Sequence, residues 1–228
     1  MGGTFSRLVS ENVAPPPEGV SVLNGTLYIV GTEARDRVSL RFNERRDELT
    51  VDVRLNQYGR TGDAFGGRVN IRQTFQASSI DRVVAFLRGG NDYYYGGGDR
   101  NSSAAIEQFV FGGDGNDLLG SGRGDDVLIG GSGNDTIRGG IGRDILIGGS
   151  GRDRLYGGRD NDLLIGGSTA IENDLSALDA ALANWVNGDF DATLAALGAI
   201  TDDLEKDWLR GESGIDELIG GVGDWLRQ

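Results

Sequence analysis

The stretch GGDGNDLLG-SGRGDDVLI-GGSGNDTIR-GGIGRDILI-GGSGRDRLY-GGRDNDLLI occupies residues 112–165 and divides into six consecutive units of nine residues. Four units follow the pattern Gly-Gly-x-Gly-x-Asp-x-apolar-x throughout. Ser121 replaces the first glycine of the second unit, and Asp160 replaces the third glycine of the sixth. The register holds over 54 residues, and a self-solvating linker would not place an apolar residue at every ninth position. The stretch therefore predicts a repetitive backbone structure.

Each unit is a glycine-rich loop that is closed by an aspartate and followed by a short apolar segment. Glycine adopts positive φ angles at little steric cost, so such a loop can turn its carbonyl groups inward. Carboxylate and carbonyl oxygens form a hard ligand set that suits Ca²⁺ rather than zinc or copper. The three residues after each aspartate are predicted to form a short strand whose middle side chain points into the core. These inward side chains are Leu119, Leu128, Ile137, Leu146, Leu155 and Leu164.

The nonapeptide pattern resembles the RTX (hemolysin-type) calcium-binding repeat of secreted bacterial proteins. The resemblance implies an all-β fold: a right-handed parallel β-roll, or β-solenoid, with two units per turn and equivalent loops stacked eighteen residues apart. Asp117, Asp135 and Asp153 would then lie on one side of the roll, and Asp126, Asp144 and Asp162 on the other. In proteins of this kind each ion lies between stacked loops, which implies sites at 117/135, 135/153, 126/144 and 144/162.

The resemblance thus predicts several Ca²⁺ ions held by aspartate side chains and by loop glycines. The predicted aspartates are Asp117, Asp126, Asp135, Asp144, Asp153, Asp162, Asp207 and Asp216. The predicted glycines are Gly113, Gly115, Gly122, Gly124, Gly131, Gly133, Gly140, Gly142, Gly149, Gly151 and Gly158. Asp207 and Asp216 lie in repeats whose glycines are degraded, as does Asp224, which is one residue out of phase. The number of ions held by the degenerate repeats at Asp36, Asp92, Asp99 and Asp224 is left open.

The composition narrows the classes of function. The 228 residues carry a net charge of −13, which argues against nucleic acid and anionic membranes as partners. The chain has no Cys and no His, so Ser-His-Asp and Cys-His catalysis are impossible and the usual zinc ligand is absent. Carboxylate pairs can hydrolyse glycosides, but nearly all of them occupy loop positions of the repeat. We therefore expect no enzyme, with no catalytic and no cofactor-binding residue other than the calcium ligands.

The chain divides into five predicted segments. Residues 1–18, with Pro15–Pro17, form a flexible lead-in, and 19–111 form an irregular β-coil with degenerate repeats. Residues 112–168 form the regular roll, 169–203 a helical insertion, and 204–228 the C-terminal repeats that cap the roll. Within the irregular coil, strands are expected at 20–23, 26–30, 37–42, 48–55 and 79–87, with a tight turn at Asn24-Gly25 and a loop over 56–68. Residues 106–111 lead into the first regular loop.

Three consecutive tyrosines, Tyr93–Tyr95, follow Asp92 in the second degenerate loop. Tyrosines stack on sugars, so a carbohydrate site is one interpretation. The other is that some of them point inward while the rest cover the neighbouring coil. The earlier degenerate loop at Gly31 and Asp36 is interpreted as a structural turn with at most a weak metal site.

One outer face of the predicted roll is apolar. Val127, Ile129, Ile145, Ile147, Leu163 and Ile165 flank the inward positions and should point outward. Soluble monomers do not normally leave a patch of several hundred Å² of this kind bare. Residues 169–188 and 189–200 carry apolar residues at helical spacing, with Asn173 or Asp174 as the N-cap of the first helix, and could form a lid. Dimerisation is the competing explanation, and a monomer is expected.

The expected function is that of a secreted calcium-binding protein that folds on meeting calcium after export. The first ten residues lack the apolar run of a cleavable signal peptide, and no stretch could span a bilayer. A type I-like export route through an uncleaved signal is therefore expected from the resemblance. The alternatives are a module that binds carbohydrate or a cell surface, and the C-terminal secretion or stabilising part of a larger extracellular enzyme.

Overall fold

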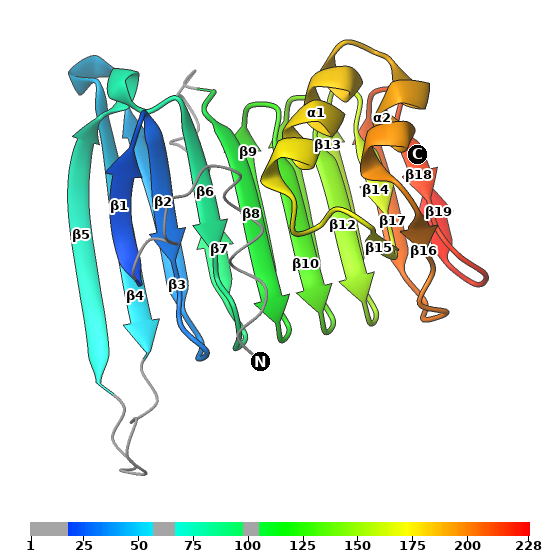
Figure 1. Ribbon diagram of the computed structural model, residues 1–228, viewed down its shortest axis with the longest axis horizontal. Coiled ribbons are helices and arrows are strands. Elements are labelled where there is room, and N and C mark those ends of the chain that lie inside the picture. Colours follow the sequence, from blue (N-terminus) through cyan, green and yellow to red (C-terminus); the bar gives the residue numbers. More distant parts are fainter. Residues whose placement is uncertain (1–17, 57–66, 98–104) are drawn as a thin grey trace.

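The computed structural model describes residues 18–56, 67–97 and 105–228, which form two large β-sheets, one short two-stranded sheet and two α-helices (Figure 1). Sheet A contains, in spatial order, β1 (Gly19–Leu23), β2 (Thr26–Val30), β6 (Arg82–Phe86), β8 (Glu107–Asp114), β10 (Val127–Ser132), β12 (Ile145–Ser150), β14 (Leu163–Ile165) and β18 (Glu217–Ile219). Sheet B contains β19 (Trp225–Arg227), β17 (Trp208–Ser213), β13 (Arg154–Arg159), β11 (Thr136–Ile141), β9 (Leu118–Arg123), β7 (Tyr93–Tyr95), β3 (Arg37–Asn43), β4 (Glu48–Asn56) and β5 (Arg68–Gln76). The predicted all-β class with a short helical segment is confirmed.

Consecutive strands of the repeat region alternate between the two sheets and pair in parallel with the strand two units further on. Leu128 pairs with Leu146 in sheet A, and Ile137 pairs with Leu155 in sheet B. The strands are longer than the expected three residues, because the Gly-Gly-x segment stays in the ladder; Gly131, for example, pairs with Gly149. The eighteen-residue repeat of the sequence is therefore the spacing between neighbouring strands of one sheet.

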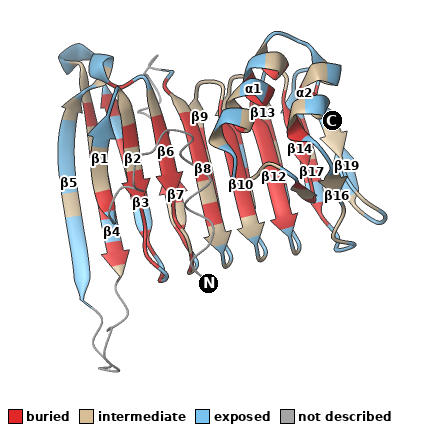
Figure 2. Cartoon of the chain, in the orientation of Figure 1, coloured by how far each residue is buried: buried red, intermediate tan, exposed pale blue. Residues whose placement is uncertain are grey.

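Aliphatic side chains from both sheets form one core cluster. Figure 2 shows buried residues along the strands of the sheets. The middle residue of every repeat strand is fully buried there, namely Leu119, Leu128, Ile137, Leu146, Leu155 and Leu164. The same core continues into the N-terminal part through Val38, Leu40 and Tyr94. Each repeat therefore contributes one layer to a continuous seam, as expected for a repeat protein.

The N-terminal strands depart from a purely parallel roll. β1 and β2 form an antiparallel hairpin, whose turn residues Asn24 and Gly25 have φ angles of 48° and 77°. β3, β4 and β5 form an antiparallel meander at the far edge of sheet B, with β5 as a mostly exposed edge strand. The sequence analysis predicted an irregular β-coil in this region and did not predict the antiparallel meander. The loop expected at 56–68 and the lead-in at 1–18 fall almost entirely outside the described residues.

Two helices, α1 (Leu175–Val186) and α2 (Phe190–Leu197), lie over the outer face of sheet A (Figure 1). Asp174 is the N-cap of α1, since its side chain accepts hydrogen bonds from the backbone of Ser176 and Ala177. A second apolar cluster joins the helices to the sheet; it contains Val127, Ile129, Ile145, Ile147, Leu163, Ile165, Leu178, Ala181, Leu182, Trp185 and Leu197. The Trp185 ring nitrogen also donates to the Asn161 carbonyl at 3.1 Å. A short antiparallel pair, β15 (Ser168–Thr169) and β16 (Ile200–Thr201), closes the base of this segment.

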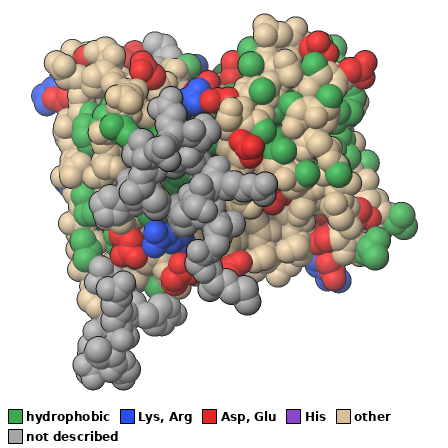
Figure 3. All heavy atoms as spheres, viewed as in Figure 1, with side chains coloured by type: hydrophobic (Ala, Val, Ile, Leu, Met, Phe, Trp, Pro, Cys, Tyr) green, Lys and Arg blue, Asp and Glu red, His purple; other side chains and the backbone are tan. Residues whose placement is uncertain are grey.

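The C-terminal end of the stack exposes apolar side chains (Figure 3). Ile215, Val222 and Trp225 are 75%, 86% and 65% exposed, and the Trp208 and Trp225 rings stack with their centres 6.1 Å apart.

No helix in the described ranges is long and apolar enough to cross a membrane.

Glu212 stands where the repeat has its second glycine and carries strain that glycine would relieve. It pairs with Gly158 in the parallel ladder and has a φ of 83°. A side chain in this left-handed region costs roughly 1 kcal/mol. We expect Glu212→Gly to raise the unfolding free energy in calcium by up to about 1 kcal/mol. Gly158, its partner in the ladder, has a φ of 122°, and we expect Gly158→Ala to lower the unfolding free energy. Denaturant titration measures both; an unchanged or less stable Glu212→Gly variant would contradict the assignment of strain.

Candidate calcium sites

Two rows of buried aspartates run along the two edges where the loops connect sheet A to sheet B. The first row contains Asp36, Asp92, Asp117, Asp135, Asp153 and Asp207, followed by Asp224. The second row contains Asp126, Asp144, Asp162 and Asp216. All except Asp224 are at most 3% exposed. Charged side chains are almost never buried to this extent without a partner, so the rows are the candidate functional site.

In each row, every aspartate after Asp36 accepts a hydrogen bond at one carboxylate oxygen from a backbone N–H group of the preceding coil. In the first row the N–H groups of Asp36, Asp92, Asp117, Asp135, Asp153 and Asp207 donate to the Oδ1 atom of the next aspartate at 2.6–2.9 Å. In the second row the N–H groups of Gln108, Asp126, Asp144 and Asp162 do the same at 2.8–3.0 Å. The structure thus places the predicted pairs 117/135, 135/153, 126/144 and 144/162 in direct contact.

The other carboxylate oxygen has no partner. Buried Oδ2 atoms without a hydrogen bond belong to Asp92, Asp117, Asp126, Asp135, Asp144, Asp153, Asp162 and Asp207. Buried polar atoms are normally satisfied by protein or by ordered water, and each exception calls for an explanation. Eight such oxygens in equivalent positions are available to bind a cation.

The first glycine of each unit provides the space in which Oδ2 lies. A Cβ atom on Gly130, Gly148 or Gly157 would lie within 2.4 Å of the Oδ2 atom of Asp135, Asp153 or Asp162, respectively. The second and third glycines have φ angles between 102° and 132° in the regular units. A Cβ atom on Gly131 or Gly149 would also lie within 2.3 Å of the carbonyl oxygen of the glycine one coil earlier. The glycines therefore keep carboxylate and carbonyl oxygens close together between stacked loops.

Burial strongly disfavours the ionised form of these carboxyl groups. Desolvation raises the pKa of Asp117 and Asp207 to about 6, of Asp126 and Asp135 to about 7, and of Asp153 and Asp162 to about 8. The pKa of Asp144 is raised well above its usual value, first by desolvation and then by the neighbouring charges of Asp126 and Asp162. A positive charge close to the rows would therefore be needed to keep these carboxyl groups ionised near neutral pH.

This arrangement fits calcium. Within the described residues no group of three or more Asp, Glu, His or Cys side chains surrounds a point, so carboxylates alone do not form a site. Carboxylates from two stacked loops together with loop carbonyls supply only oxygen, which is the ligand set that Ca²⁺ prefers. A bound divalent cation would supply the positive charge and use the unpartnered Oδ2 atoms.

The degenerate loops differ from one another. Both carboxylate oxygens of Asp36 are satisfied by Thr32 and Asn56, in keeping with a structural turn. Asp92 keeps an unpartnered Oδ2, and desolvation raises its pKa to about 8. Asp224 accepts from the backbone of both Asp207 and Gly221, so its two oxygens are used within the protein. Asp99 lies outside the described residues.

Two sets of residues at the site were missed by the sequence analysis. The residue before the aspartate forms a second ladder: Asn91, Asn116 and Asn134 accept at Oδ1 from the backbone N–H of Asn116, Asn134 and Arg152. Asp125 and Asn161 do the same on the other edge, toward Arg143 and Ile215. The recurring Asn or Asp at this position was the signal. The second set is the first glycine of each unit, whose role is to leave room for Oδ2.

The requirement for the first glycine can be tested at Gly148. A Cβ atom there would lie 2.4 Å from both Asp153 Oδ2 and the Gly166 carbonyl oxygen, whereas at Gly120 the nearest neighbour is 3.9 Å away. We expect Gly148→Ala to lower the unfolding free energy by about 1–3 kcal/mol and to weaken calcium binding, while Gly120→Ala changes neither by much. Calcium titration followed by calorimetric unfolding measures both effects; equal stability of the two variants would contradict the proposed packing.

Stacked glycine–aspartate loops between two parallel sheets define a class of calcium-binding repeat proteins. The family model for the RTX calcium-binding nonapeptide repeat matches this chain in four copies, at residues 84–102, 111–146, 138–169 and 204–224. The chain therefore carries RTX calcium-binding repeats, a family that binds Ca²⁺ and is typical of secreted proteins. The search of curated proteins found no match to the chain.

Proposed function

We propose that this protein is a secreted calcium-binding scaffold, in which a right-handed parallel β-roll holds ions between stacked loops and folds on meeting calcium after export. The observation that carries the proposal is the set of buried, unpartnered Oδ2 atoms at equivalent positions of the repeat. Desolvated carboxylates without a cation destabilise the fold, and calcium outside the cell would remove that cost.

The proposed ions lie at 117/135, 135/153, 126/144 and 144/162. These four pairs combine a hydrogen bond between stacked loops with an unpartnered Oδ2 on each member. Asp207 offers the same combination with Asp153, which supports a further site at 153/207. Asp216 has no unpartnered buried oxygen and is the weaker candidate with Asp162.

Calorimetric titration with calcium after chelation tests this proposal. We expect at least four ions per chain, with Mg²⁺ failing to replace them because it demands a smaller, near-octahedral shell. A stoichiometry of one or none would overturn it. We also propose that the protein is exported from the cell and that it is a monomer. Detection of the intact chain outside cells, and its mass in calcium by light scattering, test these two points.

A further inference from the structure

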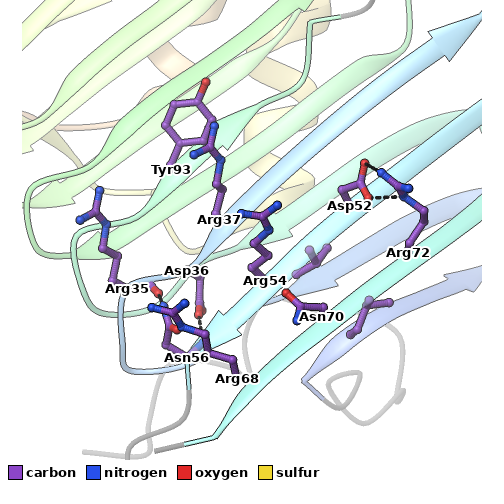
Figure 4. Close-up of a pocket in the computed structure, with 12 residues that line it drawn as sticks. Arg35, Asp36, Arg37, Asp52, Arg54, Asn56, Arg68, Asn70, Arg72 and Tyr93 are labelled. Atoms are coloured by element: carbon purple, nitrogen blue, oxygen red, sulfur yellow. Dashed lines mark hydrogen bonds and ion pairs between the residues drawn. The ribbon is translucent and has the colours of Figure 1, made fainter.

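The outer face of sheet B carries a basic groove that the calcium sites do not explain. β3, β4 and β5 contribute five outward arginines, Arg37, Arg41, Arg54, Arg68 and Arg72, against two outward carboxylates, Glu48 and Asp52. The groove has a volume of about 760 Å³ (Figure 4). Such a concentration of positive charge is notable in a chain whose net charge is −13.

The strand register brings these side chains into rows. Arg37 pairs directly with Tyr93 of β7 on one side and with Arg54 of β4 on the other, and Arg54 pairs with Asn70 of β5. The next row contains Tyr95, Ser39, Asp52 and Arg72. Neighbours in a row are one strand apart, about 4.8 Å. A row therefore offers one polar or aromatic group for each sugar-sized step along an extended ligand.

The arginines on this face of the sheet differ in how they are paired. Arg41 and Arg72 both bind the Asp52 carboxylate, at 3.0 and 2.5 Å. Among the described residues, no carboxylate forms an ion pair with Arg37, Arg54 or Arg68. The Arg37 guanidinium lies over the Tyr93 ring, 4.4 Å from its centre, which orients its N–H donors. Guanidinium groups held in this way suit bidentate binding of carboxylates and other oxyanions.

The rows continue along the rest of sheet B. Beyond Tyr93, the first row passes through Leu118, Thr136, Arg154, Trp208 and Trp225. Beyond Tyr95, the second passes through Gly120, Arg138, Tyr156, Arg210 and Arg227. The Arg138 guanidinium lies 5.0 Å from the centre of the Tyr156 ring, which repeats the arrangement of Arg37 and Tyr93. An extended polymer could therefore contact the whole length of the sheet.

We propose that this arginine groove binds an acidic polysaccharide, with Arg37, Arg54 and Arg68 binding its carboxylates and Tyr95, which is 46% exposed, supporting a sugar ring. Two observations favour this polymer over single-stranded nucleic acid. The Tyr93 ring face already holds Arg37 and is not free to stack on a base. In addition, the RTX repeats are typical of secreted proteins, which meet extracellular polysaccharides.

The test uses the full, calcium-loaded chain and a hexameric oligogalacturonate, which is too short to gel with calcium. Arg37→Gln combined with Arg54→Gln is compared with Arg45→Gln combined with Arg46→Gln. The control pair lies in the short 3-10 helix Glu44–Arg46 and removes the same two charges. We expect the groove variant to weaken binding by about tenfold or more and the control to weaken it by less than about twofold.

Arg68→Gln, an exposed single change on the edge strand, provides a second variant whose folding is not in question, and its binding should also weaken. Calcium stoichiometry measured on each variant separates failure of the groove from failure of the calcium sites. A sulfated oligosaccharide that binds through the same arginines would keep the proposal and identify the acidic group as sulfate. Equal loss in the groove and control pairs, or tighter binding of a single-stranded DNA oligomer than of either sugar, would overturn it.

Discussion

In a calcium chelator at pH 9 the protein is expected to lose most of its cooperative β structure, and to regain it either with about 1 mM calcium or on acidification to about pH 5. If each central site binds with a Kd near 0.1 mM, then about 1 mM calcium contributes roughly 1.4 kcal/mol per site. Four sites supply about 5–6 kcal/mol, which is comparable with the net stability of many domains. Circular dichroism with thermal unfolding measures the effect.

The effect of acid on the calcium-free protein follows from the sign of the pKa shifts. Burial raises the pKa of Asp117 to about 6, of Asp135 to about 7 and of Asp153 to about 8 in the folded state. A carboxyl group whose pKa is raised by folding favours the folded state at low pH. This stability is complete below the ordinary pKa of 3.8 and is lost as the pH rises from there through the folded values of about 6 to about 8.

Calcium reverses the dependence, because protons compete for the same oxygens and the apparent affinity falls as the pH falls through that range. The two stability profiles should therefore converge in acid and separate in base. A calcium-free protein that becomes less stable on acidification from pH 9 to pH 5 would contradict the assignment of the buried aspartates.

The substitution Asp144→Asn is expected to destabilise the protein in calcium and to stabilise it slightly in chelator at pH 9. Asp144 belongs to two proposed sites, since it accepts from the Asp126 backbone while its own N–H donates to Asp162. Asparagine keeps an Oδ1 acceptor but removes a carboxylate oxygen. The loss of two ions costs about 3 kcal/mol at about 1 mM calcium. In chelator the neutral side chain avoids the cost of a buried charge.

Asp125→Asn is the matched control. Asp125 precedes Asp126 in the same loop, and its Oδ1 accepts from the Arg143 backbone, a bond that asparagine can also accept. The change of charge is identical, but Asp125 is not among the buried residues with an unpartnered oxygen. Denaturant unfolding with and without calcium should show a change of sign for Asp144→Asn and little effect for Asp125→Asn. Parallel behaviour of the two variants would show that charge alone matters.

The regular part of this protein could be predicted from the sequence because every unit repeats the same local requirement. Asp117 and Asp135 occupy equivalent places in consecutive coils, so the spacing of the aspartates was enough to pair them, and the structure has them hydrogen-bonded. The apolar outward positions, such as Ile145 and Ile147, likewise indicated that something must cover them, and they pack against α1 and α2.

The N-terminal strands were harder to predict because their pairing depends on distant partners. Arg37, Arg54 and Asn70 each occupy an ordinary outward position of a strand, and only the antiparallel register brings them side by side. Periodicity shows which face a side chain occupies but not which strand lies next to it. The arginine groove could therefore not be predicted from the sequence, whereas the aspartate rows could.

The hydrogen-bond ladder of the aspartates also bears on the order in which parts of the chain can fold. Each backbone donor is satisfied by a carboxylate that lies later in the chain, usually eighteen residues on. For the N–H groups of Asp153 and Asp162 the acceptor lies 54 residues later in the chain, because the helical segment comes before Asp207 and Asp216. When calcium folds the exported chain, as proposed, the loops at Asp153 and Asp162 gain these acceptors only once the repeats beyond the helices have docked. The insertion thus makes closure of the last central loops depend on the C-terminal repeats.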